Sequence, residues 1–273
     1  RGLGKTSRLT RSVALLAVLF AVDKVAAIVR QVIIGRQFGF SQELDAFNVA
    51  NNVPDMLFAL ISGGALAMAF IPVLIEVLSR DGRQASWDLF SRVANLAFLL
   101  TAVVALLVAL FAEPLVRMEF GVAPGFSTQQ QQLVIGLMRL NLIATLLFSL
   151  SGLVIASLQA NQHFLLPALA PILYNIGQIF GALVLVPTVG YTIGPITLPA
   201  LGLGVHGLVY GVILGALLHF SIQIPGLIRF GFRWKATLRP SPEAWRVFSL
   251  MAPRLLSMAD RKSTRLNSSH GKL

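Results

Sequence analysis

The chain has 273 residues, of which 56% are hydrophobic and only 12% charged, and its mean hydropathy is +0.77. A soluble domain is usually about 25% charged, so the composition excludes an ordinary soluble protein and indicates an integral membrane protein. Cysteine is absent, which excludes disulfides and thiolate chemistry. The net charge of +11 would suggest a nucleic-acid partner for a soluble protein, but here its distribution along the chain explains it better.

Long apolar stretches, each near the roughly 20 residues that cross a bilayer, predict an all-α membrane protein. A signal peptide begins like residues 1–22, but the apolar pattern resumes after Lys24, which favours a first spanning helix. We expect a basic N-terminal tail (1–11), a lobe of six transmembrane helices (12–228), a basic loop (229–246) and the start of a seventh helix (247–259). The six spans are expected at 12–34, 44–78, 93–111, 133–158, 165–186 and 205–227.

Basic residues alternate between the two sides of these predicted spans. Twelve lie in the N-terminal tail and in the loops after the second and sixth spans, whereas the other side has only Arg36 and Arg117. The positive-inside rule therefore predicts a cytoplasmic N-terminus. The basic loop 229–246 is also expected to contact anionic membrane lipids.

The last residues, 260–273, differ in composition from the rest of the chain. The sequence DRKSTRLNSSH, residues 260–270, interrupts an apolar helical pattern and looks like a translated sequencing adapter. Residues 260–273 are therefore treated as a non-native tail, the alternative being a genuine polar C-terminus. On this interpretation the natural protein continues beyond residue 259.

The first span contains charges, which cost at least about 2.5 kcal/mol each near the bilayer centre. Asp23 and Arg30 are seven residues apart and share a helical face, with Lys24 beside it. One interpretation is an internal salt bridge in which Asp23 or Asp45 neutralises a cation. The other is an anion site facing a cavity, favoured because Lys24, Arg30 and Arg139 outnumber their clear partners. Arginine suits a diphosphate, being permanently charged and able to donate bidentately.

The second span is too long for one straight crossing and contains Asp45, Asp55 and Pro54. A helix broken near Pro54, or loosened at Gly63-Gly64, is expected in a transporter, and these residues are the predicted hinge.

Two further patterns have structural interpretations. Gly177 and Gly181, with the ladder Gly207, Gly211 and Gly215, predict close helix packing. Asn175 lies one turn after Pro171 and is expected to satisfy the carbonyl that the proline frees. The histidines are too scattered to bind a metal, and no catalytic motif occurs, so neither an enzyme nor a cofactor is expected.

Three stretches together resemble the MurJ/MviN family of lipid II flippases, in the MATE-like polysaccharide-exporter superfamily. They are VxxIVRQVIIGRQFG, LDAFNVANNVPDMLFALISGGALAMAFIPVLIEV and NQHFLLPALAPILYNIG. The resemblance implies a 14-helix protein of two six-helix lobes plus two helices, of which this chain is the first lobe. It also implies a bacterial cytoplasmic-membrane location and a role in peptidoglycan biosynthesis.

The resemblance further implies which residues hold the substrate. Lys24 and Arg30 stand where family members carry basic residues of the central cavity, and Asp45 matches a family acidic residue. With Asp55 and Arg139 they form the predicted substrate-binding set. Gln31, Phe58 and Gly63 replace charged residues found in some members, so the cavity charges are expected to differ.

The expected function is translocation of lipid II, an undecaprenyl diphosphate-linked sugar-peptide, by alternating access. Expected partners are lipid II, membrane lipids and cell-wall synthesis proteins, but not nucleic acid. The alternatives are an exporter of another lipid-linked saccharide or small molecule, and a non-transporting membrane scaffold of the same fold.

Overall fold

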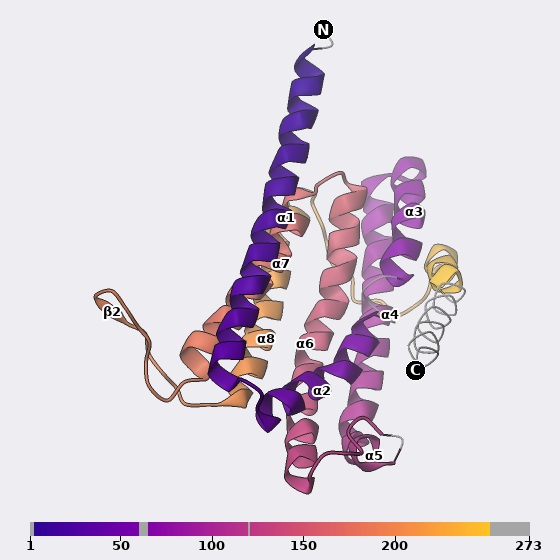
Figure 1. Ribbon diagram of the computed structural model, residues 1–273. Helices are drawn as coiled ribbons and strands as arrows, with labels where there is room; N and C mark the ends of the chain where they lie inside the picture. Colours follow the sequence, from indigo (N-terminus) through magenta and orange to yellow (C-terminus); the bar gives the residue numbers. More distant parts are fainter. Residues whose placement is uncertain (1–2, 60–64, 120, 252–273) are drawn as a thin grey trace, which may run out of the picture.

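The computed structural model describes residues 3–59, 65–119 and 121–251, and its elements are almost all helical (Figure 1). The α-helices are α1 (Leu3–Phe38), α2 (Gln42–Leu57), α3 (Ala65–Arg80), α4 (Gly82–Leu110), α5 (Ala112–Arg117), α6 (Thr128–Ala160), α7 (Leu165–Phe180), α8 (Val205–Ser221) and α9 (Ile224–Arg229). A π-helical turn, η2 (Gly181–Leu185), extends α7, and β1 (Thr192–Ile193) pairs antiparallel with β2 (Ile196–Thr197) in a short hairpin. Residues 242–251 are again helical.

The long helices run back and forth between two ends of the molecule. In Figure 1, α1 leads from the N-terminal end toward the end where α5 lies, and the β-hairpin projects from the side of the molecule. Among the described residues, four segments have the length and hydrophobicity of membrane spans: Gly82–Leu110, Thr128–Ala160, Leu165–Leu185 and Val205–Arg229. The prediction of an all-α membrane protein is confirmed.

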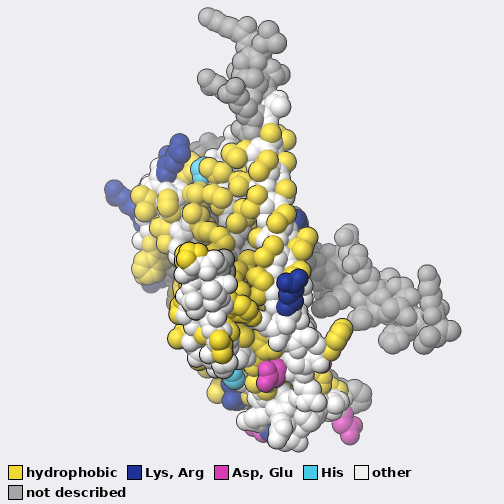
Figure 2. Space-filling view, turned by 60° about the vertical axis from the view of Figure 1, so that its left-hand side comes forward, with side chains coloured by type: hydrophobic (Ala, Val, Ile, Leu, Met, Phe, Trp, Pro, Cys, Tyr) yellow, Lys and Arg dark blue, Asp and Glu magenta, His cyan; other side chains and the backbone are white. Residues whose placement is uncertain are grey.

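The first helix exposes much of its apolar surface. Val18, Val25 and Ile28 are 57%, 60% and 64% exposed, and hydrophobic side chains cover the face of the molecule that Figure 2 shows. An apolar surface this extensive marks contact with lipid or protein rather than with water.

The second predicted span consists of two helices. Helix α2 begins at the N-cap Ser41, whose hydroxyl accepts a hydrogen bond from the Leu44 amide, and continues through Pro54 to Leu57. A π-type turn follows at residues 58–59, and α3 begins at Ala65. The helix thus ends just after Pro54, and the predicted hinge residues Gly63 and Gly64 lie outside the described residues.

The polar stretch predicted as a loop before residue 93 is instead the first part of α4, which begins at Gly82. Its polar side chains find partners on the protein. Asp88 forms an ion pair of 2.7 Å with Lys235, and the Asn95 amide donates to the Lys235 and Thr237 carbonyls at 2.8 and 3.0 Å. The segment that follows α9 therefore lies along α4.

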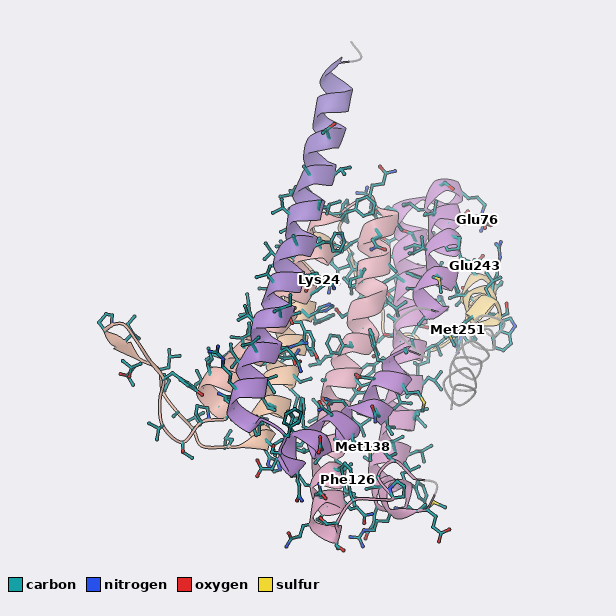
Figure 3. All side chains as sticks on the ribbon, in the orientation of Figure 1. Lys24, Glu76, Phe126, Met138, Glu243 and Met251 are labelled. Atoms are coloured by element: carbon teal, nitrogen blue, oxygen red, sulfur yellow. The ribbon has the colours of Figure 1, made fainter. Side chains whose placement is uncertain are left out.

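The last described helix begins at residue 242, earlier than the expected start at Val247. Two ion pairs join it to α3: Arg246 to Glu76 at 2.8 Å and Glu243 to Arg80 at 3.5 Å. Figure 3 shows Glu76 and Glu243 near each other at this junction. Residues 252–259 of the expected seventh helix, and the adapter-like stretch 260–270, lie outside the described residues.

Helix α6 is the centre of the bundle and packs against α2, α3, α4 and α8. Helices α7 and α8 approach each other closely through glycines. A Cβ on Gly177 would lie 2.4 Å from the Gly215 Cα, and one on Gly181 would lie 2.6 Å from the Gly211 Cα. The predicted close packing through glycine is confirmed.

Candidate functional site

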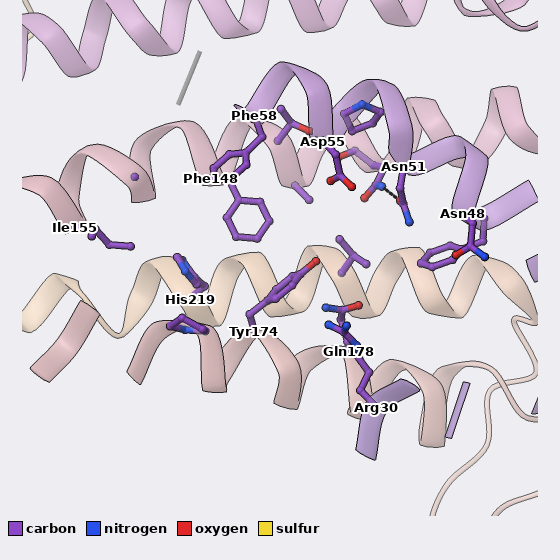
Figure 4. Close-up of a pocket in the computed structure, with 18 of the residues that line it drawn as sticks. Arg30, Asn48, Asn51, Asp55, Phe58, Phe148, Ile155, Tyr174, Gln178 and His219 are labelled. Atoms are coloured by element: carbon purple, nitrogen blue, oxygen red, sulfur yellow. Dashed lines mark hydrogen bonds between the residues drawn. The ribbon is translucent and has the colours of Figure 1, made fainter. Parts of the chain in front are cut away.

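A cavity of about 690 Å³ lies between α1, α2, α6, α7 and α8, with Ala67 of α3 at its edge (Figure 4). Two of the predicted substrate ligands, Arg30 and Asp55, line it, as does the predicted hinge residue Pro54. Figure 4 shows Arg30 and Asp55 on opposite walls. Among the described residues of the lining, these two are the only Arg, Lys, Asp or Glu. The predicted cationic surplus is therefore not seen in this lining.

Rings and side-chain amides are prominent among the uncharged side chains of the lining. One end carries rings: Phe148 lies 5.4 Å from Phe58, 5.2 Å from Tyr174 and 5.3 Å from His219 between ring centroids. Toward the other end lie four side-chain amides, which we call the amide cluster: Asn48, Asn51, Asn141 and Gln178. The lining also includes Phe47, Gln31 and Gln159. Arg30 lies at the amide end (Figure 4).

A chain of hydrogen bonds holds Arg30 in place. Its Nη1 donates to Asn175 Oδ1 at 2.9 Å, while Asn175 Nδ2 donates to Asp23 Oδ1 at 2.9 Å and to the Pro171 carbonyl at 3.2 Å. Asp23 is buried and also pairs with Lys24 at 3.3 Å. Pro171 has no amide N–H, so the carbonyl that it frees belongs to Pro167, one turn earlier. Asn175 instead bonds the carbonyl of Pro171 itself, so its predicted role is wrong, and its side chain links Arg30 to Asp23.

This arrangement leaves Arg30 available to a ligand. In the described part of the chain, no carboxylate lies within 4 Å of its guanidinium. Its partner Asn175 is neutral and accepts only one of the five N–H groups that a guanidinium offers. The internal salt bridge considered for the first span joins Asp23 to Lys24 and does not include Arg30.

The other three predicted ligands lie outside this cavity lining. Lys24 is paired with Asp23, and its side chain is 77% exposed. Asp45 lies in the first turn of α2, where a carboxylate favours the positive end of the helix dipole. Arg139 donates to the Ala109 carbonyl at 2.9 Å, in the last turn of α4, where a cation is favourable. Substrate contact by these residues stays a prediction.

Sequence reasoning missed most of the cavity lining, although a spacing signal for it exists. Asn48, Asn51 and Asp55 follow an i, i+3, i+7 pattern on α2, as do Pro171, Tyr174 and Gln178 on α7. Residues at these spacings share one helical face. The residues that line the cavity therefore recur on one face of each helix, a spacing that could be read from the sequence.

His219 is buried at the edge of the cavity, in agreement with the interpretation of it as a packed residue. Its Nδ1 lies 2.7 Å from Ser151 Oγ, and Gln223 Nε2 donates to the same hydroxyl at 2.6 Å. This contact fastens α8 to α6.

A bundle of apolar helices that surrounds a polar cavity places this chain among the multi-pass helical membrane proteins. A family model, Lipid II flippase MurJ, matches residues 34–262. The chain belongs to the MurJ family, and it is a multi-pass membrane protein.

Curated relatives and solved structures are similar over most of the chain. The lipid II flippase MurJ of Burkholderia cenocepacia is 30% identical over 239 residues, which are 85% of this chain and 43% of that protein. A probable lipid II flippase MurJ of Synechocystis is 28% identical over 93% of this chain and 47% of its own. The chain thus spans a little under half the length of these relatives.

The fold of this chain is also similar to those of solved structures. A lipid II flippase MurJ in an inward closed conformation is 20% identical, with a TM-score of 0.66 over 90% of this chain and 47% of its own. A MATE structure in complex with MaD3S is 17% identical, with a TM-score of 0.63 over 88% of this chain and 50% of its own. These likenesses show a fold common to both groups.

Proposed function

We propose that this chain is the N-terminal part of a flippase that moves lipid II across the bacterial cytoplasmic membrane by alternating access. One observation carries the proposal: Arg30 lines a cavity among the spans and is held there by a neutral side chain. An ionisable residue inside a membrane protein is costly and marks a substrate or ion pathway. Membership of the MurJ family indicates which substrate to test.

Arg30 would bind the diphosphate of the lipid. A guanidinium stays charged at any physiological pH and donates in a planar fork that matches phosphate oxygens. The relay through Asn175 to Asp23 fixes one side of this fork and leaves the other N–H groups for the ligand.

Asp55 on the opposite wall would tune this binding. A carboxylate that faces a diphosphate across a cavity repels it, which limits affinity and favours release when the cavity changes shape. Because Asp55 follows Pro54 near the end of α2, movement of α2 would change its distance to Arg30. The substrate crosses without any covalent change, so no catalytic residue is required.

We also propose that the N-terminus lies in the cytoplasm, on the basis of the twelve basic residues on its side against two on the other. The substrate would then enter from the end of the bundle at which α6 ends and α7 begins. Cell-wall synthesis proteins remain proposed partners.

Arg30→Ala should abolish complementation of a flippase-depleted bacterium by the full-length protein. Arg30 is the only Lys or Arg among the described residues of the cavity lining, so its loss removes the main attraction for the diphosphate. Membrane levels of the variant should stay normal, as measured by immunoblotting of membrane fractions. Full complementation by Arg30→Ala at wild-type protein levels would contradict the proposed role.

A second candidate is export of an amphipathic cation, which the ring-lined end of the cavity and Asp55 would suit. A flipping assay in vesicles that contain the full-length protein separates the two. Transport of lipid II supports the first proposal, and transport of an organic cation alone supports the second. Transport of neither would favour the non-transporting scaffold.

A further inference from the structure

Two side chains of the amide cluster have buried polar atoms without a partner. Gln178 is only 7% exposed and its Nε2 has no hydrogen-bond acceptor in the described structure, while Asn141 is 4% exposed and its Oδ1 has no donor. Buried polar groups are almost always paired, so each unpaired one calls for an explanation. Here both residues line the cavity, so a ligand can supply the missing partners.

The unpaired atoms have complementary chemistry. Asn141 Nδ2 donates to Asn51 Oδ1, which ties α6 to α2 and leaves the Asn141 oxygen as an acceptor. Gln178 Nε2 is a free donor on the facing helix α7. Figure 4 shows Gln178 beside Arg30, with Asn51 and Asn48 across the cavity.

A site made of side-chain amides suits a neutral ligand rich in groups that both donate and accept. Hydroxyl and acetamido groups of a saccharide have this property, whereas a carboxylate would require cations. In a lipid-linked saccharide the sugar is bonded directly to the diphosphate. A diphosphate on Arg30 therefore places the sugar within the adjoining cavity.

We propose that the amide cluster, Asn48, Asn51, Asn141 and Gln178, is the subsite for the saccharide of the transported lipid. The inference rests on the proposed function, since Arg30 fixes where the diphosphate lies. It assigns the recognition of charge to Arg30 and the recognition of the sugar to the neighbouring amides.

The test compares three lipids bound to full-length protein by native mass spectrometry. The probes are undecaprenyl diphosphate, the same lipid bearing an N-acetylated disaccharide without peptide, and lipid II. The variants are Gln178→Leu, which keeps volume but removes the hydrogen bonds, and Asn51→Ala. Asn52→Ala is the matched control, because Asn52 is the next residue of α2 and is exposed outside the cavity lining.

Gln178→Leu and Asn51→Ala should bind both saccharide lipids about five- to tenfold more weakly, as expected for the loss of one or two hydrogen bonds. Their affinity for undecaprenyl diphosphate should match that of the wild type, which also shows that the variants are folded. Asn52→Ala should bind all three lipids normally.

Several results would overturn the subsite. Equal weakening for all three lipids would mean that the amides support the cavity as a whole, and no weakening would mean that they do not touch the ligand. Weakening confined to lipid II would assign the amides to the peptide. A wild-type protein that binds none of the lipids would instead overturn the proposed function, and the subsite with it.

Discussion

Asn175 shows how one neutral side chain can place a charge inside a membrane protein. It bonds Arg30, Asp23 and the Pro171 carbonyl at the same time. If an aspartate stood at this position, it would neutralise Arg30 and repel Asp23. The amide therefore orients the guanidinium while leaving its charge for a ligand.

Asn175→Leu should weaken lipid II binding by about three- to tenfold, because Arg30 loses its orienting bond. A double-mutant cycle distinguishes positioning from a general structural role. In an Arg30→Ala background, Asn175→Leu should reduce the remaining affinity no further, as measured by native mass spectrometry of the full-length protein. Asn161→Leu, in the turn after α6, is the matched control. A similar loss in both backgrounds would show that Asn175 acts on the fold alone.

At the scale of elements, the contact of α7 with α8 depends on the absence of side chains. The backbones are so close that any Cβ at Gly177 would overlap Gly215. Close approach of this kind provides van der Waals contact, which membrane helices need because the bilayer offers no hydrophobic drive for their association.

Gly177→Ala should destabilise the protein by about 1–3 kcal/mol, the usual range for overpacking. Gly136→Ala on α6 is the matched control, since a Cβ there would meet nothing within 4 Å. Thermal unfolding of the full-length protein in detergent should show a lower midpoint for Gly177→Ala only. Equal midpoints for the two variants would contradict the packing described here.

Residue patterns within one segment predicted several features of these helices. Contacts between segments distant in the sequence could not be predicted. The glycine spacing on α7 and α8 is a local signal, and the close packing that it predicts is confirmed. The start of α4 at Gly82 was missed because its polar side chains are satisfied by residues about 140 positions later in the chain.

In the candidate site, too, single residues could be predicted from the sequence, whereas groupings of residues from different helices could not. Arg30 and Asp55 were predicted because a charge among apolar residues is conspicuous in the sequence. Lys24 and Arg139 were equally conspicuous, but both have partners outside the cavity. Lys24 pairs with the adjacent Asp23, and Arg139 donates to the Ala109 carbonyl at the end of α4. The amide cluster was missed because its members come from α2, α6 and α7, and no single stretch shows them together.

At the scale of the whole molecule, the proposed orientation rests on the unequal number of basic residues in alternate predicted loops. The absence of cysteine makes the orientation easy to test with single cysteines. Gln84 follows the turn between α3 and α4, and Gln129 lies at the start of α6; both are exposed.

In spheroplasts, an impermeant thiol reagent should label Gln129→Cys directly and Gln84→Cys only after permeabilisation. This result follows from the positive-inside rule applied to the alternating loops. The cysteine-free parent is the control for background labelling. The reverse pattern of labelling would contradict a cytoplasmic N-terminus.

We expect the cavity of this chain to bind a lipid diphosphate through Arg30. Native mass spectrometry of the full-length protein with lipid II and an ordinary anionic phospholipid, for the wild type and Arg30→Ala, tests it most directly. The wild type should bind lipid II selectively, and Arg30→Ala should lose that selectivity. Equal, selective binding by both would contradict this expectation and would make Arg30 a structural residue.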